Sequence, residues 1–64
     1  MSALVAATAP RPQTRAEILA ELVVHHELCA QELRDQGLPK RAAWFESRAR
    51  EHRATLHAVI RSER

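Results

Sequence analysis

The 64-residue chain contains a single glycine, Gly37, and it is followed by Leu38 and Pro39. No glycine or proline occurs between Gln13 and Gln36 or after Pro39. Glycine is favoured just past the C-terminus of a helix, where the backbone turns left-handed, and proline is favoured at the first position of the next helix. The sequence therefore predicts two uninterrupted helices joined by a tight turn at Gly37-Leu38-Pro39, with Leu38 folding back onto Leu33.

The predicted ends of the helices follow from local signals. Thr14 and Glu17 have the spacing of a capping box, in which each side chain bonds the backbone N–H of the other residue. We expect the first helix to run from Thr14 to about Gln36 and the second from Pro39 to about Arg61. Residues 1–13 carry Pro10 and Pro12 and are interpreted as a flexible N-terminal arm, which leaves residues 14–64 as the helical hairpin domain.

Both helices carry a stripe of side chains spaced alternately by three and four residues, which is typical of helices that pack along their length. If the chain folds back at the turn, Leu22 faces Leu56, His26 faces His52 and Leu33 faces Phe45. The sequence therefore predicts an all-α fold, an antiparallel helical hairpin. The two stripes consist of Leu19, Leu22, His26, Cys29 and Leu33 in the first helix, and of Ala42, Phe45, Ala49, His52, Leu56 and Val59 in the second.

The first helix has more apolar surface than one neighbour can cover, because its apolar residues sweep roughly 260° of the helix against the ~100° that a two-helix seam needs. We expect Ile18, Val24 and Leu28 to be uncovered on one flank and Val23 on the other. Uncovered apolar surface of this kind marks an interface. We therefore expect the hairpin to pair into a four-helix bundle as a homodimer, or to bind a larger protein, through Ile18, Val24 and Leu28.

Three histidines and the only cysteine fall close together in the predicted hairpin. His25 and Cys29 share one side of the first helix, and His26 faces His52 across the seam. Imidazole and thiolate are ligands that zinc prefers, so His25, His26, Cys29 and His52 are candidate metal ligands. The alternative interpretation is a polar layer that fixes the register of the bundle.

A small basic and aromatic patch is expected near the turn. Arg41 and Arg48 lie three residues before and four residues after Trp44, so either guanidinium can stack on the indole. The patch could contact a phosphate and a base, it could be a protein contact, or Trp44 could simply cover the end of the bundle. Its members are Lys40, Arg41, Trp44 and Arg48.

Composition excludes several other functions. The net charge of +2 is too small to require nucleic acid, and the single cysteine excludes an internal disulfide. No nucleophile has an obvious base, and the only glycine ends a helix, so we expect neither catalysis nor a cofactor nor a small-molecule substrate. Residues 1–10 lack the basic start of a signal peptide and are too short to span a membrane, so we expect a cytoplasmic protein.

The sequence thus favours a non-enzymatic protein-interaction module, such as a regulator, adaptor or inhibitor. One alternative is a nucleic-acid-binding four-helix-bundle dimer that uses the second helix, since Lys40–Arg64 contains seven basic and three acidic residues. Another is a metal-responsive bundle.

Overall fold

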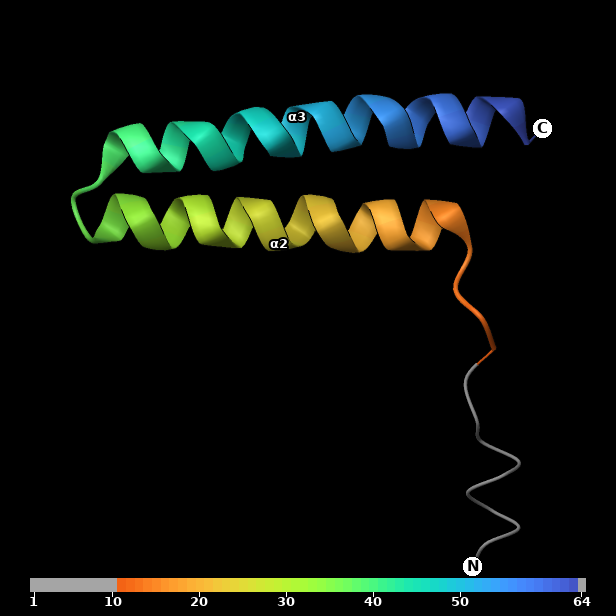
Figure 1. Cartoon of the computed structure of the whole chain (residues 1–64), viewed down its shortest axis with the longest axis horizontal. Coiled ribbons are helices and arrows are strands. Elements are labelled where there is room, and N and C mark those ends of the chain that lie inside the picture. The colour runs from red at the N-terminus through yellow and green to blue at the C-terminus, as the bar shows by residue number, and fades with distance from the viewer. Residues whose placement is uncertain (1–10, 64) are drawn as a thin grey trace, which may run out of the picture.

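The computed structural model describes residues 11–63, which form two helices side by side and antiparallel (Figure 1). Helix α2 spans Arg15–Asp35 and helix α3 spans Pro39–Ser62. This confirms the all-α helical hairpin, whereas pairing into a four-helix bundle stays a prediction. Residues 1–10 of the predicted arm lie outside the described residues, and residues 11–13 are exposed and form no helix.

Helix α2 begins with the predicted capping box. The backbone N–H of Glu17 donates to the Thr14 hydroxyl oxygen over 3.1 Å, and the N–H of Thr14 donates to the Glu17 carboxylate over 3.4 Å. The Thr14 hydroxyl also donates to that carboxylate over 3.0 Å. Hydrogen bonds from the Thr14 side chain and backbone hold the pKa of Glu17 below its usual value of 4.5. The ionised carboxylate therefore helps to hold the start of the helix.

The turn closes as a Schellman motif, as the sequence predicts. Gly37 has a φ of 77°, in the left-handed region that favours glycine. The N–H of Gly37 donates to the carbonyl of Arg34 over 3.0 Å, and the N–H of Leu38 donates to that of Leu33 over 2.9 Å. Pro39 is the first residue of α3, so the missing N–H of proline breaks no helical hydrogen bond.

The helices meet along a narrower stripe than the sequence suggests. The most buried residues of the described chain are two valines and three alanines, namely Val23, Ala30, Ala42, Ala49 and Val59. Ala30 lies seven residues after Val23, and Ala49 seven after Ala42, and this spacing keeps residues on one side of a helix. Because alanine is small on both helices, the two backbones can approach closely along this stripe.

This packing corrects the prediction for the first helix. Val23, expected to be uncovered, is only 7% exposed, whereas Leu22 and Cys29, expected at the centre of the seam, are only half-buried. Helix α2 is therefore rotated from the predicted orientation by about half of the ~100° step between successive residues. The rotation places Ala30, rather than Cys29, against α3.

The predicted register is confirmed at the middle of the hairpin. The rings of His26 and His52 lie 5.0 Å apart between centroids. Two ion pairs also join the helices: Glu27 pairs with Arg53 over 2.6 Å, and Arg34 pairs with Glu46. Ala30 and Ala49 lie midway between these pairs along their helices, which agrees with their burial at 3% exposure each.

Within residues 11–63, neither helix is apolar enough over a sufficient length to cross a bilayer.

The alanine seam can be tested by enlarging it. Replacing Ala30 or Ala49 with leucine should force the helices apart and lower the free energy of unfolding by about 1–3 kcal/mol, the usual cost of overpacking. The matched control is Ala54→Leu, because Ala54 is exposed on the same helix as Ala49. Urea unfolding followed by circular dichroism measures the effect, and equal stability of all three variants would contradict the close contact.

Candidate functional site

The three residues predicted to form an interface are exposed apolar side chains on α2. Ile18 is 45% exposed, Val24 54% and Leu28 65%. Their exposure agrees with the expected uncovered surface, and their role as an interface stays a prediction. Exposed apolar residues are common when they are isolated, so their arrangement on the helix matters more than their number.

The structure divides these residues between two sides of α2. Val24 and Leu28 line a shallow hollow with Ala20, Glu21 and His25. Ile18 does not line it. At about 100° per residue, Ile18 instead falls beside Leu22, toward the side of the hairpin where the histidines lie. The expected single flank is therefore divided between the hollow, which faces away from α3, and the side with the histidines, and the two adjoin at His25.

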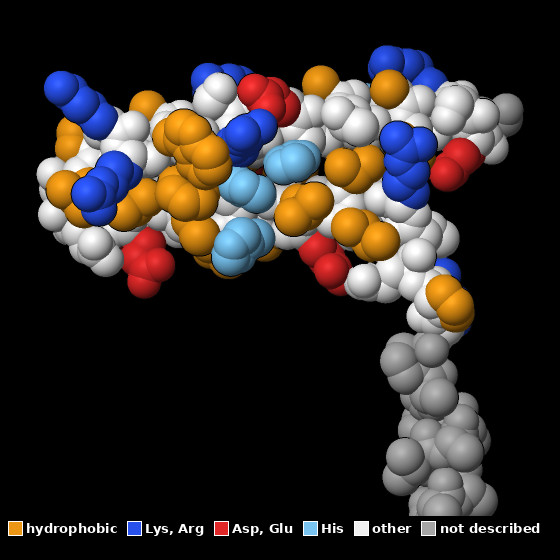
Figure 2. All heavy atoms as spheres, in the orientation of Figure 1, with side chains coloured by type: hydrophobic (Ala, Val, Ile, Leu, Met, Phe, Trp, Pro, Cys, Tyr) orange, Lys and Arg blue, Asp and Glu red, His pale blue; other side chains and the backbone are white. Residues whose placement is uncertain are grey.

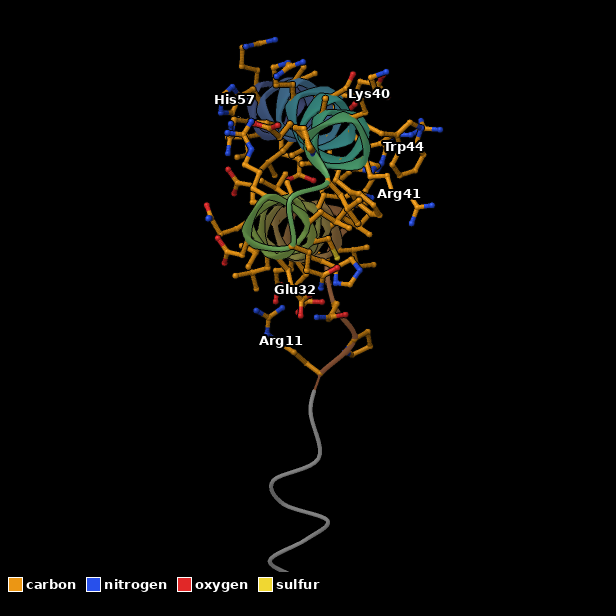
Figure 3. All side chains as sticks on the ribbon, turned by 90° about the vertical axis from the view of Figure 1, so that its left-hand side faces the viewer. Arg11, Glu32, Lys40, Arg41, Trp44 and His57 are labelled. Atoms are coloured by element: carbon orange, nitrogen blue, oxygen red, sulfur yellow. The ribbon has the colours of Figure 1, made fainter. Side chains whose placement is uncertain are left out.

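Acidic side chains surround the hollow. Glu21 lines it, and Glu17 and Asp35 follow the same helical stripe toward the two ends of α2. Glu32 is exposed and points away from α3 (Figure 3). The outer side of α2 thus combines a small apolar centre with negative charge.

A chain of neighbouring rings, in tilted and edge-to-face pairs, runs across one face of the hairpin. The His26 ring lies 5.0 Å from that of His52, 5.7 Å from that of His25 and 5.7 Å from that of Phe45. Phe45 in turn meets Trp44 edge-to-face at 4.8 Å. We call the side that carries these rings the histidine face. Figure 2 shows it, with the histidines set between hydrophobic side chains of both helices.

The central imidazole is held by the backbone. The Nδ1 atom of His26 lies 2.7 Å from the carbonyl oxygen of Leu22. Because a carbonyl oxygen can only accept a hydrogen bond, the Nδ1 atom is the donor and carries a proton. This bond fixes the ring orientation of His26 at the centre of the histidine face.

The opposite face of the hairpin is polar. Glu27 and Arg34 lie on the other side of the seam from His26, and both form ion pairs with α3. The hydrogen bond from Arg34 to Glu46 raises the pKa of the guanidinium above its ordinary value. These residues, together with Gln31, line a hollow over the buried Ala30. Among residues 11–63, ion pairs join the two helices only here, so the two faces differ in chemistry.

The predicted basic patch lies at the turn end of the histidine face. Trp44 is 53% exposed, and the guanidinium carbon of Arg48 lies 5.0 Å from its ring centroid. Lys40 and Arg41 are exposed, and Arg41 and Trp44 point to the side opposite His57 (Figure 3). Of the two predicted stacking partners, the structure selects Arg48, which also pairs with Glu51 over 3.2 Å.

The candidate metal ligands come together as pairs. The Cys29 sulfur lies 3.7 Å from the Nε2 atom of His25, and His26 stacks against His52. Within the described part of the chain, no group of three or more histidine, cysteine, aspartate or glutamate side chains is placed to hold a metal ion. A structural zinc site normally has four protein ligands. Both interpretations, a metal site and a polar packing layer, stay predictions.

The polar face is the feature that sequence reasoning missed. Its signal is present, since Glu27 and Arg34 are seven residues apart on α2 and Glu46 and Arg53 are seven apart on α3, in both cases with the acid before the base. In an antiparallel pair such residues face each other, so matched charges at this spacing predict which side of the seam is polar.

Comparisons of the chain with models of protein families, with curated proteins and with solved structures find no match.

Metal removal tests the packing interpretation of the histidines. Because His25, His26, Cys29 and His52 form pairs, incubation with EDTA should leave the helical circular dichroism signal and the melting temperature unchanged. Loss of helicity on chelation, restored by zinc, would show that these residues hold a metal. The Cys29→Ala variant should respond to the chelator as the wild-type chain does.

Proposed function

We propose that the chain is a small non-enzymatic protein-interaction module, acting as a helical-hairpin dimer or bound to a larger partner protein as a regulator, adaptor or inhibitor. This proposal rests on one observation, the difference in size between the apolar side chains inside the hairpin and those on its surface. The most buried residues are no larger than valine, while the exposed large apolar side chains are Ile18, Val24, Leu28, Leu38, Trp44 and Ile60.

An interior of this size gives little stability by itself. Ordering each residue costs about 1–2 kcal/mol of backbone entropy, and full burial of a Val, Leu or Ile side chain returns about 1.5–3 kcal/mol. Two valines, three alanines and a set of half-buried side chains make a thin core for helices of 21 and 24 residues. Covering the exposed apolar residues with protein supplies the burial that the hairpin lacks.

The outer hollow on α2 supports a partner of defined chemistry. Val24 and Leu28 offer an apolar contact, and Glu21, together with the exposed Glu32, makes the surroundings negative. Such a surface suits an amphipathic helix with basic residues around its apolar stripe. The larger-partner form of the proposal therefore favours a basic helix over an acidic one.

A second candidate function is nucleic-acid binding, favoured by the stack of Arg48 on Trp44 beside the exposed Lys40 and Arg41. Residues that neutralise phosphates make affinity fall steeply with salt. If the protein-interaction proposal holds, titration with mixed DNA and RNA should show weak binding without a steep salt dependence. A steep slope that Arg41→Ala makes shallower would favour nucleic acid instead.

The proposed function predicts that folding depends on association. For a chain that folds as it dimerises, each tenfold increase in concentration adds about 1.4 kcal/mol, which raises the melting temperature of a domain of this size by about 5–10 °C. Circular dichroism melting at several micromolar concentrations, with sedimentation alongside, measures this. A monomer that melts sharply at a temperature independent of concentration would contradict the proposal.

A further inference from the structure

Within residues 11–63, α2 contributes to two apolar surfaces, the outer hollow and the histidine face, and only the second approaches the size that a second copy of the chain needs. A stable protein interface buries about 800 Å² of each partner. One side of a single helix of this length offers a strip about 33 Å by 10 Å, whereas one face of the two-helix hairpin measures about 33 Å by 20 Å, roughly 650 Å² in flat projection. The outer hollow of α2 is therefore too small, and a whole face of the hairpin approaches the required area.

The two faces of the hairpin are not equivalent as interfaces. The polar face carries the ion pairs Glu27–Arg53 and Arg34–Glu46, which contact with another protein would have to desolvate. On the histidine face the helices meet instead through rings, Ile18 and Trp44 stand about half exposed on it, and the basic patch with Arg41 and Arg48 lies at its turn end. Half-buried Leu22, Cys29 and Phe45 continue the apolar surface between them. The histidine face is therefore the one that a second copy can cover.

Charge determines how the second copy must be oriented. Helix α2 has five acidic and two basic residues, a net charge of −3, and α3 has two acidic and six basic residues, a net charge of +4. Each helix contributes one acidic and one basic residue to the two ion pairs between the helices. These pairs therefore leave the net charge of each helix unchanged, and that charge can interact with a second molecule. Stacking α2 on α2 and α3 on α3 brings like charges together, whereas stacking α2 on the α3 of the other copy brings opposite charges together.

Resting on the proposed function, we propose that a second copy of this chain packs on the histidine face, with its turn at the same end, so that α2 of each copy lies on α3 of the other. The two-fold axis then runs along the helices. His26 and His52 lie near the middle of both helices, so the histidine layers of the two copies meet halfway along the bundle. Trp44 of each copy covers the last turn of α2 in the other.

The face is tested by a matched pair of variants on α2. Ile18→Glu places a charge on the histidine face, and Leu28→Glu places one in the outer hollow. Sedimentation of the full chain should show at least about a tenfold weaker association for Ile18→Glu. The two-fold axis places residue 18 in the interface twice, so the substitution removes the same apolar contact from both copies. Leu28→Glu should associate like the wild-type chain.

The orientation is tested with spin labels near the ends of α2, on labelled variants whose association is first shown to match the wild type. A spin label on Gln36→Cys, in a Cys29→Ala background whose association is first shown to match the wild type, reports the distance between the two turns. With both turns at one end, the labels should lie within about 20 Å, whereas turns at opposite ends would place them about 30 Å or more apart. A second label, on Arg15→Cys, should give an equally short distance at the other end of the bundle.

The outcomes separate this inference from the proposed function. If Leu28→Glu abolishes association and Ile18→Glu does not, or if both variants behave alike, the histidine face is not the interface and only this inference fails. Long distances between the labels overturn the orientation in the same way. A wild-type chain that melts sharply as a monomer contradicts both the inference and the proposed function.

Discussion

The contact between alanine side chains is the constraint on which the rest of this hairpin depends. Ala30, Ala42 and Ala49 lie in the seam at no more than 3% exposure, and side chains this small let two helices approach closely. Close approach gives good backbone packing but buries little apolar area. The larger apolar residues of α2 consequently lie beside the seam or behind it, and the shortage of buried area makes association the expected source of stability.

Most of the fold could be predicted because it depends on local rules. The capping box at Thr14 and the Schellman turn at Gly37 fix the ends of both helices to within about one residue of the predicted positions, the usual precision of such assignments. The rotation of α2 could not be predicted in the same way. Its apolar residues cover so much of the helix that hydrophobicity does not single out one side, and the choice depends on where both helices present alanine.

The sequence predicts which residues of the candidate surfaces are exposed, but not which of them lie together on one surface. The exposure of Ile18, Val24 and Leu28 and a guanidinium stacked on Trp44 follow from spacing on one helix. Which of these residues share a face depends on how α2 is rotated about its axis. That rotation is determined by the packing of α2 against α3. With Val23 turned into the seam, Ile18 joins the histidine face, while Val24 and Leu28 are left on the outer side.

The division of polar and apolar contacts across the seam gives the hairpin two faces of different chemistry. Ion pairs join the helices on one face, and rings meet across the other. A dimer formed through that face still leaves the acidic hollow around Val24 and Leu28 uncovered on each copy. Two hollows on opposite sides of a two-fold dimer would let one module bind two basic helices, which is how a chain of 64 residues can join two copies of a partner.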